Sequence, residues 1–464
     1  MSLATAFHKQ LKLRPSQPSL RFDGQVYTWS QVAERLKGAV AHIRSLELGD
    51  RTTLATATDD PFTRVLWMLA GSWCGHVWLL SGKQVGEEPS NVVWLHASIE
   101  ASSEELPEPA AWLEDDVHWL LRSSGTTGQP KLISLSWLQI EANARGAEQR
   151  FGLTSSDSWL CVLPLGHIAG ASIIARSFVV GLSVSLSDFC ADTFSDTIDL
   201  HGVTVASVVP TMLGRVLARS SRPPASLRIL MVGGAAFPRR LAEQAEDWPV
   251  WLTWGMSETA SQIATSPMKT ALEEGLEPIA DTVVSVDQDQ YLCVRGPIAP
   301  GGYWQTSDLG ELSASGKVRV HGRGDDVVKV GGNRINLARV KRIFEEEVSA
   351  VDLEVFAVSE DDLGVQVGLA YRQGTDGILE SLTKAAEALE VWERPHWLMP
   401  MLELPLNHRF KVDRGQIAAE CEVRRKQFGS VPGRMTFLPG DQLLEPTGSV
   451  NSTVYRDSEG RVTL

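Results

Sequence analysis

Short apolar runs that alternate with helical patterns are the feature that most limits the folds open to this chain. Three such runs are 158–165 (SWLCVLPL), 203–210 (VTVASVVP) and 227–234 (LRILMVGG), each bounded by Gly, Pro or Asp. Helical patterns such as 212–219 (MLGRVLAR) separate them. Because strands covered on both faces are apolar throughout, this alternation predicts an α/β fold with buried, largely parallel sheets.

The pattern changes near residue 306. The following segment predicts a β-hairpin with its turn at Ser315-Gly316, then a helix over 335–348 (INLARVKRIFEEEV) and a strand over 353–358 (LEVFAV). Strands and helices no longer alternate regularly here, which indicates a separate, smaller α+β unit. The tail after Phe428 shows no periodicity, and its role stays unassigned.

The net charge of the chain limits the classes of partner that it can bind. Its 464 residues include 43 Lys and Arg against 57 Asp and Glu, a formal net charge of −14. An acidic surface repels nucleic acid and anionic membranes, so we expect neither as a partner. Any phosphate-bearing ligand therefore needs a locally built site.

Other compositional features favour an ordinary globular protein of the cytoplasm. With 43% apolar and 22% charged residues, general disorder is excluded. The five cysteines are scattered without a CxxC pair, which argues against a disulfide framework or a zinc site. No run of 18 apolar residues and no apolar segment near the N-terminus is present, so we expect no membrane insertion and no export.

The segment 123–131 (SSGTTGQPK) is the most informative motif. It follows the apolar run WLLR and gathers glycines, hydroxyl groups and a lysine, which are groups that surround a polyphosphate. The residues expected to bind phosphate are Ser123, Ser124, Gly125, Thr126, Thr127, Gly128 and Lys131. The spacing is not that of a Walker A loop. A plain surface loop of Ser, Thr and Gly is the alternative.

The same segment resembles the phosphate loop of the adenylate-forming superfamily, which contains acyl-CoA synthetases, luciferases and nonribosomal adenylation domains. Six further segments resemble the superfamily's motifs in the same order. They are 163–170 (LPLGHIAG), 232–238 (VGGAAFP), 254–262 (WGMSETASQ), 306–312 (TSDLGEL), 322–335 (GRGDDVVKVGGNRI) and 404–417 (LPLNHRFKVDRGQI). Seven collinear motifs make chance resemblance untenable.

The resemblance implies two domains and a ligase reaction. We expect an N-terminal AMP-binding domain over 1–324, a small mobile C-terminal α+β lid over 325–428 with its hinge at Asp325, and the tail over 429–464. A carboxylic acid attacks the α-phosphate of ATP to give an acyl-adenylate and pyrophosphate, and CoA then displaces AMP. Mg²⁺ is the implied cofactor, and Glu258 is its implied ligand, since carboxylate oxygens suit this ion.

The resemblance also assigns the nucleotide and CoA sites. Further ATP-binding residues are Gly234, Ala235, Trp254, Gly255, Ser257, Asp308 and Arg323, with Asp308 accepting hydrogen bonds from the ribose. A core tryptophan is the alternative for Trp254. Lys411 is the implied catalytic lysine of adenylation, and the CoA side is formed by Lys329, Gly331 and Gly332. The chain departs from the superfamily pattern at Ser307 and Phe410, both of which replace a glycine.

One branch of the superfamily is most similar. The segment 254–265 (WGMSETASQIAT) resembles that of o-succinylbenzoate-CoA ligases of menaquinone and phylloquinone biosynthesis. This substrate is a dicarboxylate, and its non-reacting carboxylate needs a cationic partner when buried. Arg176, in an apolar helical run, suits that role. The remaining expected substrate-binding residues are His167, which is also a candidate catalytic residue, Gly233 and Met256.

Alternatives remain open for several of these assignments. Arg176 could instead snorkel to solvent or to Asp188, and His167 could be a gate between half-reactions or a core residue. The chain could be another aryl- or acyl-CoA ligase, an enzyme that loads a carrier protein, or a catalytically silent nucleotide-binding protein. A homo-oligomer is among the partners considered.

Overall fold

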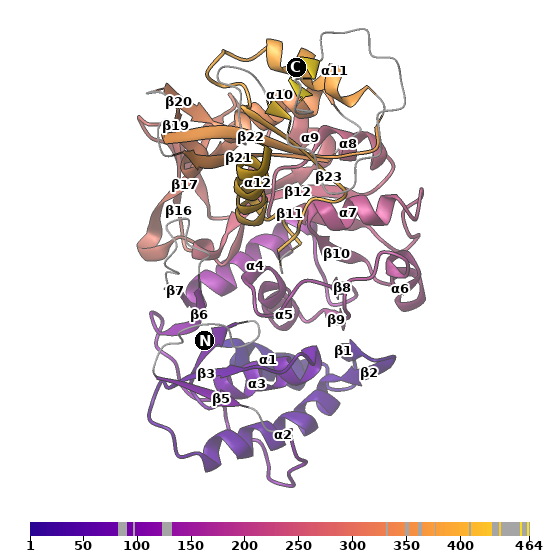
Figure 1. Ribbon diagram of the computed structural model, residues 1–464. Helices are drawn as coiled ribbons and strands as arrows, with labels where there is room; N and C mark the ends of the chain where they lie inside the picture. The colour runs from indigo at the N-terminus through magenta and orange to yellow at the C-terminus, as the bar shows by residue number, and fades with distance from the viewer. Residues whose placement is uncertain are drawn as a thin grey trace. The chain divides into compact units, whose positions relative to one another are not determined.

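The computed structural model describes most of the chain (Figure 1). The described residues are 1–81, 91–95, 98–122, 132–330, 333–348, 352–360, 364–375, 377–407, 410–428, 436–437, 455–456 and 462–463. The expected phosphate loop, Ser123–Lys131, and the glycines Gly331 and Gly332 lie outside them.

The chain divides into two compact units. The first comprises Met1–Gly234, Ala245–Thr306 and Leu312–Arg319, and the second comprises Ala235–Gln244, Ser307–Glu311 and Val320–Leu464. The expected lid boundary and hinge at Asp325 stay a prediction. Within the described ranges, no helix combines the length and the apolar character needed to cross a membrane.

A five-stranded sheet belongs to the first part of the chain, coloured indigo to violet in Figure 1. Its strand order is β5 (Val92–Leu95), β3 (Thr53–Thr56), β4 (Val77–Leu80), β6 (Val117–Arg122) and β7 (Leu132–Ser136). All neighbouring pairs are parallel except β6 and β7. The helices of this part are α1 (Leu3–Leu13), α2 (Trp29–Ser45) and α3 (Pro61–Trp73).

A nine-stranded sheet is the largest sheet of the first unit. Its order is β14 (Glu277–Pro278), β13 (Ser261–Pro267), β12 (Val250–Met256), β11 (Ile229–Gly233), β10 (Val205–Val208), β8 (Ser158–Cys161), β9 (Ser183–Leu186), β1 (Pro18–Phe22) and β2 (Gln25–Thr28). The three predicted apolar runs supply β8, β10 and β11, which pair in parallel. The helices that follow strands in this stretch are α4 (Trp137–Phe151), α5 (Ile168–Val180), α6 (Phe194–His201), α7 (Pro210–Leu217) and α9 (Met268–Glu273). The expected α/β class is confirmed.

A four-stranded sheet carries the predicted hairpin. Its order is β15 (Val283–Val286), β16 (Tyr291–Arg295), β17 (Tyr303–Leu312) and β18 (Val318–Arg323), with the short 3₁₀ segment η2 (Pro300–Gly302) before β17. The turn between β17 and β18 is closed by a hydrogen bond of 2.8 Å from the Ser313 amide to the Lys317 carbonyl. Gly316 has φ 79°, a left-handed value that favours glycine, so the predicted turn is confirmed.

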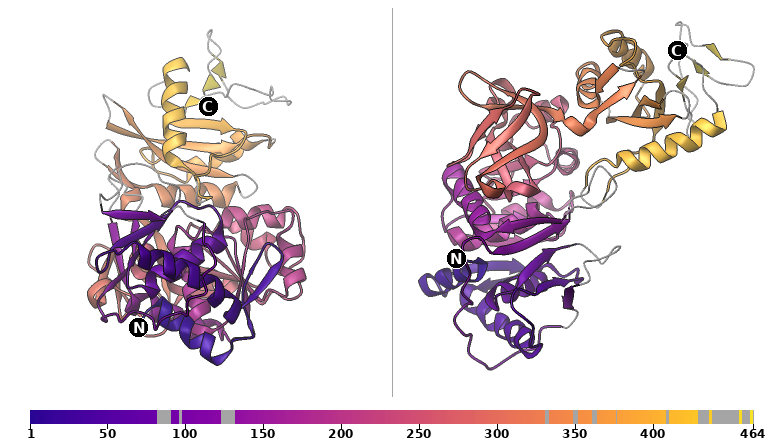
Figure 2. Two further views of the ribbon diagram at one scale, coloured as in Figure 1. Left: turned by 90° about the horizontal axis from the view of Figure 1, so that it is seen from below. Right: turned by 90° about the vertical axis from the view of Figure 1, so that its left-hand side faces the viewer.

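The second unit is built around another sheet, orange to yellow in Figure 2. Its strands are β19 (Val327–Val330), β20 (Asn333–Asn336), β21 (Leu353–Glu360), β22 (Gly364–Arg372), β23 (Trp397–Met401), β24 (Thr436–Phe437), β25 (Tyr455–Arg456) and β26 (Val462–Thr463). They are ordered β20-β19-β22-β23-β24-β26-β25, and β21 also pairs with β22. The helices are α8 (Arg239–Gln244), α10 (Leu337–Glu347), α11 (Ile378–Glu387) and α12 (Arg414–Phe428).

Alternation along β21 explains why helices cover both faces of this sheet. Val355 joins the apolar cluster of α10 and α11, whereas its neighbour Phe356 joins the cluster that contains Ile417 of α12. Successive side chains of a strand point to opposite faces, so one strand serves both cores. The helix and strand predicted over 335–348 and 353–358 are α10 and β21.

Candidate active site

Arg176 lies on the buried helix α5 of the first unit. Every residue of α5 except Ala169 is buried, and the side chain of Arg176 is 0% exposed. Its Nη2 donates to Asn143 Oδ1 at 2.9 Å and to Gln262 Oε1 at 3.4 Å, and its guanidinium carbon lies 5.3 Å from the centre of the Trp159 ring. The side chain is fixed inside the fold, so the alternative of snorkelling to solvent is wrong.

The charge of Arg176 is not neutralised by any described carboxylate. Its hydrogen-bond partners are neutral amides, and its Nε and Nη1 make no hydrogen bond within the described residues. Burial lowers the pKa of Arg176 to about 10, so the guanidinium remains charged at neutral pH. Burying an unpaired cation is costly, which makes this position suited to an anionic group of a ligand.

Two polar residues of α4 hold the segment 254–262 in place. Gln139 Nε2 donates to the Glu258 carbonyl at 3.1 Å, and one turn further on Asn143 Nδ2 donates to the Gln262 carbonyl at 2.7 Å. Asn143 thereby bonds both this segment and Arg176. We did not predict Gln139, Asn143 or Gln262, although buried amides spaced by four residues on one helix are a signal for such bracing.

The segment itself contains strained backbone. After β12, the 3₁₀ turn η1 (Ser257–Thr259) carries Glu258, which is half-buried. The next two residues, Ala260 and Ser261, have φ of 55° and 116°, which L-residues rarely adopt. Strain of this kind clusters at functional sites, because the surrounding contacts must hold it.

Two glycines beside this turn allow neighbouring segments of the chain to pack against their backbone. A Cβ on Gly255 would lie 1.8 Å from the Ser261 carbonyl oxygen, and one on Gly233 would lie 2.4 Å from Thr253 Cγ2. Gly233 ends β11 and Met256 ends the parallel neighbour β12, so both predicted residues lie at the carboxyl end of the sheet. Ligands bind at that edge in α/β sheets. Gly234, with φ 84°, follows directly, and Ala235 comes after it.

The positions of Trp254 and His167 do not by themselves indicate a role in ligand binding. Trp254 is 8% exposed and packs in an apolar cluster with Ile263 and Ile279, which fits the core-residue alternative. His167 is half-buried at the N-cap of α5, and its backbone amide bonds the Pro164 carbonyl at 3.1 Å. Its chemical role stays a prediction.

The second unit contains the other predicted residues. Asp308 is half-buried on β17, Arg323 ends β18, and Lys329 lies on β19. Asp325 lies in the 3₁₀ turn η3 (Gly324–Asp326). Lys411 follows Phe410 in a turn closed by a hydrogen bond of 2.8 Å from the Asn407 amide to the Lys411 carbonyl.

Phe410, at which the chain departs from the superfamily pattern, has φ 57°. Glycine adopts this left-handed conformation without cost, whereas a bulky residue is strained there. The turn is held by the Phe410 amide, which donates to the Asn407 carbonyl at 2.9 Å, and by the bridge between Leu406 and Val412. These contacts hold a left-handed conformation at residue 410 without a glycine.

An ion-pair network joins the Lys411 turn to Asp326, next to the expected hinge residue. Arg414 Nη1 lies 2.5 Å from Asp326 Oδ1, and its Nε donates to Glu354 Oε1 at 2.7 Å. Glu354 is 3% exposed and also pairs with Lys341 Nζ at 2.6 Å. Burial alone would raise the pKa of Glu354, but Lys341 and Arg414 lower it overall. These partners of Arg414 were not predicted.

Comparisons with known proteins agree with this fold. The family of AMP-binding enzymes matches residues 77–304. The 2-succinylbenzoate–CoA ligase of Bacillus cereus (strain AH820) is 24% identical over 461 residues, covering 87% of this chain and 96% of the relative.

Two solved structures of o-succinylbenzoate-CoA synthetase (MenE) from Bacillus subtilis are similar in fold. The complex with the acyl-adenylate OSB-AMP has a TM-score of 0.77 and 22% identity, covering 89% of this chain and 97% of that chain. The complex with ATP and a magnesium ion has a TM-score of 0.76 and 23% identity, covering 90% and 99%. The chain has the adenylate-forming fold that its motifs predicted.

Proposed function

We propose that this chain, which its match over residues 77–304 identifies as an AMP-binding enzyme, is an ATP-dependent 2-succinylbenzoate–CoA ligase. The Bacillus cereus (strain AH820) relative with this name aligns along 87% of the chain, which supports an acid–CoA ligase of the same type. Such a ligase makes 2-succinylbenzoyl-CoA for menaquinone or phylloquinone biosynthesis.

The observation that carries the proposal is the buried, uncompensated guanidinium of Arg176. A fatty or simple aryl acid has one carboxylate, and that group is consumed by adenylation. 2-Succinylbenzoate keeps a second carboxylate, which would supply the charge that Asn143 and Gln262 do not. We infer that Arg176 binds this second carboxylate and thereby selects a dicarboxylic acid.

In the first half-reaction, the reacting carboxylate attacks the α-phosphate of ATP, forms a new C–O–P linkage and releases pyrophosphate. We assign Lys411 to stabilise the negative charge that develops between carboxylate and phosphate. Asp308 is assigned to the ribose hydroxyls, and Arg323 assists it. Gln139 and Asn143 brace the strained turn after Glu258, and this supports a fixed position for the carboxylate of Glu258.

Glu258 fits the expected Mg²⁺ site. Within the described residues, no three His, Cys, Asp or Glu side chains gather as a ready metal cage. Mg²⁺ needs no such cage in nucleotide sites, because it takes one or two carboxylates and completes its shell with phosphate oxygens and water. When bound, the ion would neutralise charge on the polyphosphate.

In the second half-reaction, the thiol of CoA attacks the acyl-adenylate carbonyl, and the C–O bond to AMP breaks. We assign this state to the strand that carries Lys329, with Asp325 as the hinge between the two states. Hinges are short element-terminal segments that absorb changes in φ and ψ. The 3₁₀ turn Gly324–Asp326 is a segment of that kind.

A pyrophosphate-release screen over aryl and alkyl acids tests the proposal. We expect 2-succinylbenzoate to be the best substrate, with Mg²⁺ dependence and with AMP and acyl-CoA formed only after CoA is added. Activity on fatty acids alone would remove the substrate assignment and leave the chemistry. Adenylate formation without use of CoA would favour carrier-protein loading, and no adenylate with any acid would favour a silent nucleotide-binding protein.

A further inference from the structure

Three stretches of the second unit come before the expected hinge at Asp325 in the chain. They are Ala235–Gln244, which includes α8, Ser307–Glu311, and residues 320–324 at the end of β18. The rest of the unit follows the hinge. A turn of the lid about Asp325 moves the residues after the hinge relative to those before it. A contact between these two groups of residues therefore depends on the state of the lid.

The helix α8 is tied by the chain to the first unit at both ends. It follows β11 by way of Gly233, Gly234 and Ala235, which we expect to contact the acid and ATP, and the first unit resumes at Ala245. A lid that turns must therefore leave α8 behind or strain these short connections.

Arg240 of α8 forms an ion pair with Asp352, which follows the hinge and comes directly before β21. The side chain of Arg240 is 22% exposed, and its burial lowers the pKa of Arg240. Glu345 of α10 acts on the same guanidinium and opposes this shift. A half-buried cation that precedes the hinge thus interacts with two carboxylates that follow it.

Asp352 is fixed to the sheet that follows the hinge. The Arg372 amide on β22 donates to the Asp352 carbonyl at 2.8 Å, and Arg372 Nε lies 3.6 Å from Asp352 Oδ2. The carboxylate of Asp352 therefore has one cation from each side of the hinge. Its pair with Arg240 depends on the state of the lid, whereas its pair with Arg372 does not.

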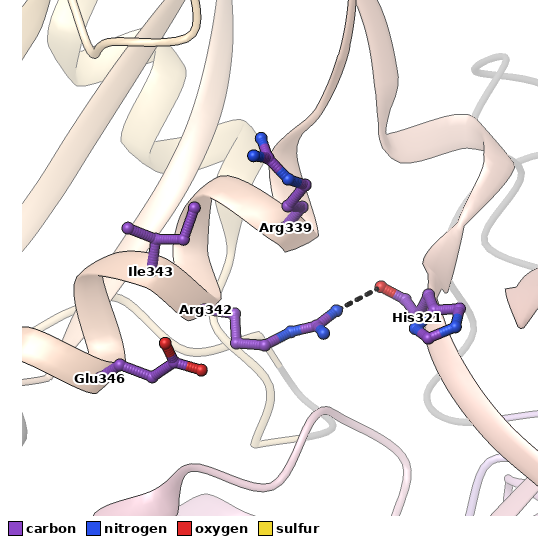
Figure 3. A pocket seen from close by; sticks show the side chains of 5 residues that line it. All are labelled: His321, Arg339, Arg342, Ile343 and Glu346. Atoms are coloured by element: carbon purple, nitrogen blue, oxygen red, sulfur yellow. Dashed lines mark hydrogen bonds between the residues drawn. The ribbon is translucent and has the colours of Figure 1, made fainter. Parts of the chain in front are cut away.

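A second contact across the expected hinge joins β18 to α10 (Figure 3). Arg342 Nη2 donates to the His321 carbonyl at 3.3 Å. Gly322 has φ 137°, and a Cβ there would lie 2.6 Å from the Cβ of Ala338, so glycine allows the strand and the helix to approach. A hollow of about 300 Å³ remains at this contact, lined by His321, Arg339, Arg342, Ile343 and Glu346. Such incomplete packing suits a contact that forms in one state and is lost in another.

We propose that Arg240 is a positioning residue for the lid, an inference that rests on the proposed ligase function and its hinge. The Arg240–Asp352 ion pair stabilises one of the two lid states, and it breaks when the lid turns to the other. The contact between Arg342 and His321 breaks in the same step. A partly exposed pair contributes little free energy, so it biases the balance between the two states without preventing turnover.

The rates of the two half-reactions test this role. Pyrophosphate release without CoA measures adenylation, and thioester formation from supplied acyl-adenylate measures the second step. Arg240→Met should change the ratio of the two rates about fivefold, because one lid state loses its ion pair. Asp352→Asn should have the same effect, the double variant should go no further than either single one, and Arg240→Lys should keep the parent ratio. Equal slowing of both half-reactions by Arg240→Met, an unchanged ratio, or additive effects in the double variant would overturn the proposal.

Two neighbouring arginines give matched controls. Arg239 is 73% exposed and lies 3.8 Å from Glu243 of its own helix, so Arg239→Met should keep the parent ratio. Arg372→Met removes a cation from Asp352 without breaking a contact across the hinge, and it should not shift the ratio in the direction of Arg240→Met. A shift in that direction of equal size would assign the effect to the charge around Asp352 and contradict the proposal.

Arg342→Met tests whether the two contacts belong to the same lid state. It should move the ratio of the two rates in the same direction as Arg240→Met, and by less, because a single hydrogen bond to a carbonyl is lost. A shift in the opposite direction would show that the two contacts favour different states and would overturn their shared role.

Amide hydrogen exchange without substrates gives a readout that needs no activity. Exchange in α8 should accelerate in Arg240→Met, and Arg239→Met should match the parent chain. Unchanged exchange in Arg240→Met would contradict the proposal even in an active enzyme. If the parent chain forms no adenylate with any acid, the ligase function fails, and exchange still decides whether Arg240 holds α8 to Asp352.

Discussion

Arg176, which is buried, and Arg414, whose side chain is 36% exposed, are two arginines with opposite kinds of partner. Arg176 in the first unit is bonded by the neutral amides of Asn143 and Gln262, and burial lowers its pKa to about 10. Arg414 in the second unit bonds the carboxylates of Asp326 and Glu354. Burial alone would lower the pKa of Arg414, but these two carboxylates raise it.

The difference separates a structural cation from one that can serve a ligand. Arg414 is neutralised by its own chain, and it ties the Lys411 turn to Asp326 beside the expected hinge. Arg176 has neutral partners on its Nη2, and its other nitrogens make no hydrogen bond within the described residues. A buried charge that no described residue compensates is costly to keep, so Arg176 is suited to the anionic group of a ligand that we proposed for it.

The largest expected effect is on the paired arginine. Arg414→Met leaves the buried carboxylate of Glu354 with one cation instead of two. Removing one member of a fully buried pair costs about 3 kcal/mol, and the loss here should stay below that value because the side chain of Arg414 is 36% exposed. We expect amide hydrogen exchange of β21, which carries Glu354, to accelerate accordingly. Exchange rates that match the parent chain would show that Arg414 does not stabilise this sheet.

Lys341→Met is the matched control for that variant. Lys341 bonds the same carboxylate at 2.6 Å, but Arg414 and its second partner Asp326 remain in this variant. We therefore expect a smaller loss of protection than for Arg414→Met. The reverse order would identify Lys341 as the main partner of Glu354.

The second-largest effect is expected for Arg176, and it should appear in the KM for the acid substrate. Arg176→Met removes the cation assigned to the second carboxylate, so the KM for 2-succinylbenzoate should rise at least about 30-fold, or about 2 kcal/mol. The free energy of unfolding should change less than for Arg414→Met. The loss of two amide hydrogen bonds is opposed by relief of a buried charge.

A monocarboxylic aryl acid is the control substrate for Arg176→Met. Its turnover should respond little, because it lacks the second carboxylate. An unchanged KM for the dicarboxylic acid would remove the substrate-pocket role of Arg176. A large loss of stability without a change in KM would make Arg176 a structural residue like Arg414.

The features that the sequence predicted are those that depend on residues close together in the chain. Apolar runs identified β8, β10 and β11, and Gly316 marked the turn of the β17–β18 hairpin, because these elements depend on neighbouring residues. The motifs placed Arg176 in a buried helix.

The partners of the two arginines could not be predicted in the same way. Asn143 and Gln262 are 33 and 86 residues from Arg176, and Glu354 and Asp326 are 60 and 88 residues from Arg414. Such pairings follow from how strands and helices pack in space. The sequence also did not predict the strained backbone at Ala260, Ser261 and Phe410, because nothing in their residue types favours a positive φ.

A pH measurement sharpens the role of the paired network. The pKa of Glu354 is below its ordinary value of 4.5, so its contribution to stability is present above that value and is lost as pH falls through the lower folded-state pKa. We expect protection of β21 to decrease as pH falls from 5 to 3, and Glu354→Gln to weaken this dependence. Arg176, with a pKa of about 10, adds no change in this range.

Glu345 provides a control of opposite sign in the same network. Burial raises its pKa, so its protonation favours the folded state as pH falls. Glu345→Gln should therefore steepen the acid loss of protection. If both glutamine variants flatten the profile, the assignment of opposite shifts to the two carboxyl groups is wrong.

The smallest expected effect is a change in stability caused by backbone strain at Phe410, in the Lys411 turn. It tests whether a fixed backbone at this residue or the Arg414 ion pairs hold the turn. At φ 57°, alanine keeps the strain of Phe410 and glycine releases it, so Phe410→Gly should be more stable than Phe410→Ala by about 1 kcal/mol. Val423, which is 65% exposed on α12, should show the ordinary helical order, in which alanine is the more stable. Thermal unfolding of the four variants measures both differences. Alanine being better at both positions would mean that residue 410 leaves the left-handed region in solution, and that the Arg414 ion pairs hold the turn without a fixed backbone at that residue.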